Sequence, residues 1–280
     1  MSKKRVLITG ASGFIGASLT RELIASGDEV HVLLRREAAR WRLAGLDGQY
    51  EMHHADLRQL ADVRRAVDAC RPDVVYHLAA HGTLAGEHDR SEVFDSNVSG
   101  TCNLLEALTR HDYRMLVHAG SSSEYGHKSR PMRELDRLEP RSDYAVSKAA
   151  ATLLVQAESY KGRPVTTVRI FSAYGPWEAP TRLVPYVMEC CLRGERPQIT
   201  DGWQPRDFIH VDDCLALLQR AAETPAAAGH ILHAGTGRRQ TVRGMVELAL
   251  QICTGGYLTA EFGAEPARRD EPREWVADNI

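Results

Sequence analysis

The sequence predicts an α/β fold, in which a doubly wound parallel sheet carries a smaller C-terminal lobe. Over the first two-thirds of the 280 residues, short apolar runs alternate with helical patterns, which is typical of a parallel sheet covered on both faces. After residue 175, prolines interrupt this pattern and indicate an irregular lobe folded over the carboxyl edge of the sheet. We therefore expect one domain over residues 1–172 and a second over 173–280, with some later segments returning to the main sheet.

Each strand of the first part is predicted from a short apolar run that ends near a turn residue. The expected strands are Val6–Thr9, Val30–Leu34, Tyr50–His54, Val74–Leu78, Met115–His118 and Val165–Phe171. Helices are expected between them where apolar residues recur every three to four positions, over 14–26, 60–70, 97–108 and 144–160. In the second part we expect helices over 184–192 and 213–223 and short strands over 207–211 and 230–233.

The composition excludes several classes of protein. A net charge of −2 gives no electrostatic reason to bind nucleic acid or an acidic membrane. No apolar run approaches the roughly 20 residues that cross a bilayer, and the first one is too short for a signal peptide. The six cysteines are scattered and are expected to be reduced and mostly buried. His53, His54 and His210 are interpreted as structural, so we expect a cytoplasmic protein without a metal.

A glycine-rich turn predicts a dinucleotide site. Gly10, Gly13 and Gly16 follow the first strand and open the first helix, the context that separates such a site from random glycines. Gly10 allows the tight turn, Gly13 lets a diphosphate approach the backbone, and Gly16 lets helix and strand pack closely. The free N–H groups of the helix then face the diphosphate. With Ser12, Phe14 and Ile15 of the same loop, these residues predict a Rossmann-type cofactor site.

The end of the second strand indicates which dinucleotide binds. An NAD site usually has a carboxylate there for the ribose hydroxyls, whereas this chain has Arg35 and Arg36 after Leu34. Arginine can pair with a 2′-phosphate, so NADP(H) is favoured, although two arginines could also be a solvated loop. Further cofactor contacts are expected after the third and fourth strands, from Asp56, Leu57, Leu78, Ala79 and Ala80.

Tyr144 and Lys148 predict proton transfer beside that cofactor. They lie four residues apart and therefore share one helix face. A tyrosine has a pKa near 10, and a neighbouring ammonium together with an oxidised nicotinamide would lower it toward neutrality. The serine run that begins at Ser121 ends the fifth strand, where a hydroxyl can hold the substrate oxygen. Asn97 is interpreted as a buried polar bracket or a helix-terminal residue.

At this point the chain resembles the extended short-chain dehydrogenase/reductases that act on nucleotide sugars, the epimerase/dehydratase family. The matching segments span nearly the whole chain: residues 9–16, 77–80, 97–101, 121–126, 144–148, 174–176 and 206–213. The resemblance implies that Ser121, Tyr144 and Lys148 are catalytic and that Arg206 grips the nucleotide diphosphate. It also places Arg182 and the segment 197–200 near the base and ribose, and implies further substrate contacts from His81, Ser122, Ser123 and Ser172.

Three departures from the family pattern bear on the reaction. Dehydratases carry an acid two or three places after the catalytic hydroxyl, where this chain has Ser123 and Glu124, and Glu124 aligns just outside that position. Ser172 stands where many relatives have a substrate-binding asparagine. Relatives also continue about thirty residues beyond Ile280, so the tail is expected to be truncated.

The runs at 121–126 and 171–178 look most like those of 4-keto-6-deoxy sugar reductases. The resemblance therefore favours NADPH-dependent reduction of the C4 keto group of a nucleoside-diphosphate 4-keto-6-deoxyhexose, with the arginine pair as support. A redox-neutral epimerase with tightly bound NAD(P) is the alternative, and a dinucleotide-sensing regulator is a minor one. A homodimer through the helices over 97–108 and 144–160 is expected from the family.

Overall fold

The computed structural model describes residues 3–82, 89–266 and 272–279. Its centre is a seven-stranded sheet with the order β11-β6-β5-β4-β1-β2-β3, in which every neighbouring pair is parallel. The direction of winding reverses between β1 and β4, and open sheets of this kind bind ligands at the carboxyl ends of those strands. The strands are β1 (Arg5–Thr9), β2 (Glu29–Leu34), β3 (Glu51–His54), β4 (Val74–His77), β5 (Met115–Ser121), β6 (Val165–Ile170) and β11 (Ile231–Ala234).

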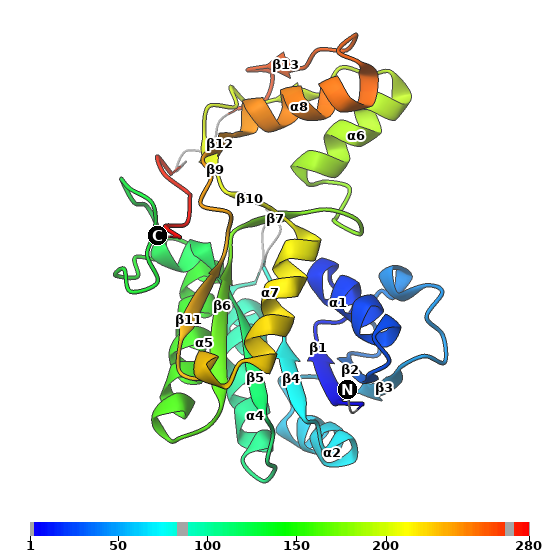
Figure 1. The fold of residues 1–280 in the computed structure, drawn as a ribbon, viewed down its shortest axis with the longest axis vertical. Coiled ribbons are helices and arrows are strands. Elements are labelled where there is room, and N and C mark those ends of the chain that lie inside the picture. Colours follow the sequence, from blue (N-terminus) through cyan, green and yellow to red (C-terminus); the bar gives the residue numbers. More distant parts are fainter. Residues whose placement is uncertain (1–2, 83–88, 267–271, 280) are drawn as a thin grey trace.

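Helices cover both faces of this sheet, as predicted (Figure 1). On one face, α1 (Phe14–Ala25) and α7 (Val211–Glu223) bury an apolar stripe that includes Leu19 and Leu218. On the other face, α2 (Leu60–Cys70), α4 (Gly100–Leu108) and α5 (Asp143–Tyr160) bury residues such as Val67 and Leu104. The connections along the chain contain α3 (Arg90–Phe94) and four short helical turns. These turns are η1 (Trp41–Leu43), η2 (Asp95–Ser99), η3 (Ser122–Tyr125) and η4 (Pro225–Ala227), of which η2 is π-helical.

The C-terminal lobe lies beyond the carboxyl ends of the strands (Figure 1). Its core joins α6 (Leu183–Arg193) to α8 (Val242–Thr254) through Val187, Val246 and Leu250. Pairs of short strands complete it: β7 (Ser172–Tyr174) with β10 (Phe208–His210), β8 (Gln198–Ile199) with β13 (Glu261–Phe262), and β9 (Pro205–Arg206) with β12 (Gln240–Thr241). Since α7 and β11 return to the main layer, a division near residue 172 into two domains stays a proposal.

Several elements differ from the sequence-based prediction. The expected helix over 97–108 starts as the π-helical turn η2, and the expected strand over 207–211 is shorter because Val211 already begins α7. The strand expected over 230–233 is β11, the edge strand of the main sheet. α3 and α8 were not predicted. No helix of the described chain combines the length and apolarity needed to cross a membrane.

Candidate active site

The glycine loop has the geometry of a diphosphate cradle. Gly10 has φ +75°, and a Cβ there would lie 2.6 Å from the backbone of Leu78 and Ala79, so β1 and β4 approach too closely for any other residue. A Cβ on Gly16 would lie 2.2 Å from the Gly10 carbonyl oxygen. No side chain caps the N-terminus of α1 at Gly13 and no acid lies in its first turn, so its N–H groups are available to an anion.

Hydrogen bonds fix the strand ends that surround this loop. The Thr9 hydroxyl lies 2.7 Å from His77 Nδ1 and 3.3 Å from the backbone nitrogen of Ala79, which donates to it. His77 Nε2 lies 2.9 Å from the Thr101 hydroxyl of α4. Burial, with a smaller effect from the charge of Lys148, lowers the pKa of His77 to about 3. His77 is therefore a neutral link between β1, β4 and α4.

Arg35 and Arg36 are exposed at the tip of β2. Neither forms an ion pair within the described chain, and they take the first two places after β2, where an NAD site usually has an acid. Arg58 donates to both oxygens of Asp56, from Nη2 to Oδ2 (2.6 Å) and from Nε to Oδ1 (3.1 Å), and lowers its pKa, with a smaller contribution from Arg35. Leu57 is held from α4, where Asn103 donates to its carbonyl at 2.8 Å. These groups fit an adenosine with an anionic substituent beside Arg35.

A bracket of four side chains, Arg21, Trp41, Arg42 and Trp177, contacts the glycine loop through Arg42. Arg42 donates to the carbonyls of Trp177 (2.7 Å) and Ser12 (3.3 Å), and its guanidinium lies 4.2 Å from the Trp41 ring. Arg21 stacks 4.2 Å over the Trp177 ring. Trp177 has φ +72°, which is rare for a bulky residue and requires such support. This bracket was not predicted from the sequence.

Ser121 and Tyr144 are joined at the carboxyl end of β5. Burial raises the pKa of Tyr144 to about 12, while a hydrogen bond with the Ser121 side chain and the charge of Arg182 lower it. Lys148, one turn further along α5, is 2% exposed, and burial lowers the pKa of its ammonium to about 8. The charges that act on Tyr144 here are thus those of Glu124 and Arg182 rather than that of Lys148.

Asn97 connects this helix to the loop after β4. Its Oδ1 accepts from the His81 backbone nitrogen at 2.7 Å, and its Nδ2 donates to the His81 carbonyl (3.0 Å) and the Ser147 hydroxyl (2.9 Å). It is 2% exposed, so its role is that of a polar bracket. The π-helical turn that contains Asn97 is a feature frequently found at functional sites.

Glu124 belongs to a buried network underneath Ser121. It is 0% exposed, and its Oε1 accepts from the Ser121 backbone nitrogen (2.7 Å) and the Thr152 hydroxyl (3.0 Å). Its Oε2 lies 2.8 Å from Nε of Arg169, which is 2% exposed and also donates to the Tyr125 hydroxyl at 2.6 Å. This carboxylate therefore supports the serine turn and is engaged on both of its oxygens.

The remaining substrate candidates lie in η3 and in the C-terminal lobe. Arg182 directly precedes α6 and its charge acts on Tyr144, whereas Ser123 contacts the Ser121 hydroxyl at 2.7 Å and Ser122 is buried in η3. The Arg206 guanidinium lies 5.8 Å from the centre of the Trp275 ring and donates to the carbonyl of Pro205. Ser172 is the first residue of β7.

Glu178 is a further acid that the sequence did not single out. Burial raises the pKa of its carboxyl to about 7, against the effect of Arg182, and its buried Oε2 has no hydrogen-bond partner. The charge of Arg182 acts on both Glu178 and Tyr144, which relates this acid to the candidate site.

Comparison with known proteins agrees with this geometry. The chain matches the model of the NAD dependent epimerase/dehydratase family over residues 6–235. It is 30% identical over 288 residues to a dTDP-glucose 4,6-dehydratase of Streptomyces griseus, covering 98% of this chain and 85% of that protein.

Two solved structures show the same fold. UDP-glucose 4-epimerase of Thermotoga maritima with UDP-glucose has a TM-score of 0.88 at 26% identity and covers 98% of this chain and 89% of its own. UDP-glucuronic acid 4-epimerase of Bacillus cereus, in complex with UDP-glucuronic acid and NAD, has a TM-score of 0.85 at 26% identity, with 98% and 90% covered. These relatives are epimerases and 4,6-dehydratases, not specifically 4-ketoreductases. The chain belongs to the NAD-dependent epimerase/dehydratase family and is an enzyme of that family.

Proposed function

We propose that this enzyme is a redox-neutral 4-epimerase of nucleoside-diphosphate sugars. The observation that carries the proposal is the engagement of Glu124. Elimination needs an acid beside the reacting sugar, but Glu124 is fully buried against Arg169, and the two residues between it and Ser121 are serines. This arrangement therefore lacks the acid that a 4,6-dehydratase needs, whereas an epimerase requires only the serine, the tyrosine and the lysine.

The residues of the site divide the epimerase chemistry between them. Gly10, Gly13 and the uncapped start of α1 would hold the diphosphate of NAD(P), which supplies a reversible hydride acceptor when bound. Tyr144 would take the proton of the C4 hydroxyl and return it after the sugar has presented its other face. Ser121 would orient the same oxygen and favour the phenolate through its hydrogen bond with Tyr144, and Lys148 would hold the nicotinamide ribose.

The cofactor bracket supports a redox-neutral enzyme. An epimerase keeps one cofactor molecule bound through oxidation and reduction. A bracket that contacts the cofactor-binding glycine loop is consistent with such retention. Arg42 contacts the loop itself through the Ser12 carbonyl. Arg206, Arg182, Ser172 and His81 remain proposed contacts of the nucleotide sugar, as in the family resemblance.

Net reduction of a 4-keto-6-deoxy sugar is the second candidate. The exposed Arg35 and Arg36 favour it, because they suit the 2′-phosphate of NADPH, the usual cellular reductant. The one solved relative named above that contains a dinucleotide carries NAD, so NADP(H) stays a proposal for this chain. We also propose a cytoplasmic homodimer through α4 and α5, since Val146, Leu153 and Tyr160 are exposed at heptad spacing along α5.

One experiment separates the two reactions. The purified protein is denatured to release and identify bound nucleotide, and native protein is assayed with UDP-, dTDP-, GDP- and CDP-hexoses for inversion at C4 by NMR. In parallel, absorbance at 340 nm is followed with NADPH and the corresponding 4-keto-6-deoxy sugars. Inversion with retained cofactor and no net consumption supports the epimerase. Substrate-dependent loss of absorbance refutes it in favour of the reductase.

A further inference from the structure

A cluster of metal-ligating side chains lies on the edge of the main sheet, outside the candidate active site. It comprises His31 and Glu29 of β2 together with Glu51 and His53 of β3. In the parallel register His31 is opposite Glu51, and His53 is two residues further along its strand. Side chains at i and i+2 share a sheet face, so these groups converge on one side of two adjacent strands.

Three potential ligand atoms of the cluster lie close together. Nδ1 of His31 lies 2.9 Å from Nε2 of His53 and 3.9 Å from an oxygen of Glu51. All three ligand atoms lie within 4.8 Å of one another. The two imidazole rings are stacked at 5.2 Å, which keeps their nitrogens adjacent. Two imidazoles and a carboxylate form a ligand set suited to zinc and similar dications.

Glu29 sets the tautomer of the buried imidazole. Its carboxylate lies 3.1 Å from Nε2 of His31, so this nitrogen is assigned the proton and Nδ1 accepts from Nε2 of His53. A carboxylate that accepts from the second nitrogen of a histidine is the usual orienting partner at metal sites. Because the His31 side chain is only 4% exposed, its orientation is fixed before a metal binds.

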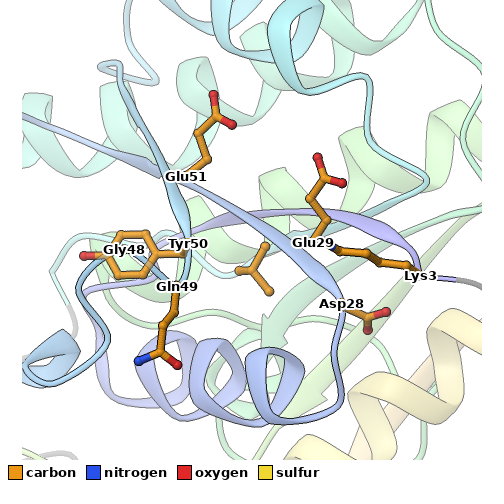
Figure 2. Close-up of a pocket in the computed structure, with 8 residues that line it drawn as sticks. Lys3, Asp28, Glu29, Gly48, Gln49, Tyr50 and Glu51 are labelled. Atoms are coloured by element: carbon orange, nitrogen blue, oxygen red, sulfur yellow. The ribbon is translucent and has the colours of Figure 1, made fainter.

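Solvent reaches the cluster through its two carboxylates. Glu29 and Glu51 line an open cavity of about 390 Å³ at the amino-terminal ends of β2 and β3. Figure 2 shows both carboxylates on the same side of the strands, opposite to Gln49. The Glu51 side chain is 65% exposed and can turn toward the imidazoles without disturbing the core.

We propose that His31, Glu51 and His53 bind a divalent transition metal, with Glu29 orienting His31. Zinc, with three protein ligands and one water, fits this set. On binding, Nε2 of His53 gives up its hydrogen bond to His31, and its proton moves to Nδ1 of the same ring. The metal would tie the four-residue edge strand β3 to β2 and stabilise the folded chain without taking part in the sugar chemistry.

The test is a calorimetric titration of the tag-free, reduced, full-length protein with zinc chloride after treatment with EDTA. We expect one zinc per chain. His53→Ala and Glu51→Gln should each weaken binding at least tenfold, and Glu29→Gln should weaken it about 10- to 100-fold. His54→Ala is the matched control, because His54 is the exposed neighbour on the opposite face of β3 and should leave binding unchanged.

A melting curve gives a second readout that does not depend on activity. At a zinc concentration 100 times the dissociation constant, the melting temperature of the wild type should rise by roughly 5–10 °C and that of His53→Ala should not. The proposal is overturned if the wild type binds no zinc, or if His53→Ala and Glu51→Gln bind it as tightly as the wild type does.

Discussion

Replacing Glu124 with glutamine tests whether the buried ion pair beneath Ser121 is structural. Glutamine keeps an oxygen at the Oε1 position, so the hydrogen bonds from the Ser121 backbone nitrogen and the Thr152 hydroxyl survive. At the Oε2 position it presents an NH2 group to Nε of Arg169, which is itself a donor. The substitution therefore removes one charged hydrogen bond and leaves a guanidinium, 2% exposed, without its counter-charge.

The cost follows from that burial. Removing one partner of a buried ion pair typically costs about 3–5 kcal/mol, because the other charge stays buried. Since two of the three hydrogen bonds to Glu124 are kept, we expect a loss near the lower end, about 3 kcal/mol. This is below the stability of roughly 5–15 kcal/mol that is usual for native proteins, so the variant should still fold.

The assay is urea denaturation followed by circular dichroism, with Glu189→Gln as the control. Glu189 makes an exposed ion pair with Arg193 one turn further along α6, and such pairs contribute only about 0.3–0.5 kcal/mol. A loss below about 1 kcal/mol for Glu124→Gln would refute the structural assignment. If the folded variant instead keeps its stability but loses turnover a hundredfold or more, Glu124 takes part in the chemistry.

Three further predictions address the catalytic and cofactor residues. Tyr144→Phe should lower kcat by about 10²–10⁴-fold while bound nucleotide is retained, as measured by C4 inversion and by nucleotide release. Glu178→Gln should raise the melting temperature at pH 8 more than at pH 5. The wild-type carboxyl has a folded pKa raised to about 7, so its contribution to stability is present below its ordinary pKa near 4.3 and is lost as the pH rises through 7; equal shifts at both pH values would contradict this. Arg42→Ala should speed dissociation of the cofactor at least tenfold, relative to Arg40→Ala, because Arg42 alone of the two joins Trp177 to the glycine loop; unchanged release would argue against the bracket.

The local motifs were predictable because their chemistry depends on short spacings. The glycines of the cradle span seven residues, and Tyr144 and Lys148 are four apart, so the sequence alone orders them on one loop and one helix face. The parallel sheet followed from the alternation of apolar runs and helical patterns, and the structure confirms it.

The supporting contacts were not predictable in the same way, because they join distant parts of the chain. Arg42 and Trp177 are 135 residues apart, and Glu124 and Arg169 are 45 apart. Spacing in the sequence carries no information on such pairs. Helix α8 differs, since Val242, Val246 and Leu250 recur at helical spacing before the terminating Gly255, and this signal could have found it.

The proposed epimerase activity and the proposed preference for NADP do not exclude one another. Arg35 and Arg36 bear on which dinucleotide binds, because they lie where a 2′-phosphate would be met. We expect the bracket around Arg42 to affect how long the cofactor stays bound, and the ion pair of Glu124 with Arg169 to affect which reaction the site can perform. These three properties are set by different residues and are physically independent. The redox-neutral 4-epimerase proposed above, binding NADP, is consistent with all three.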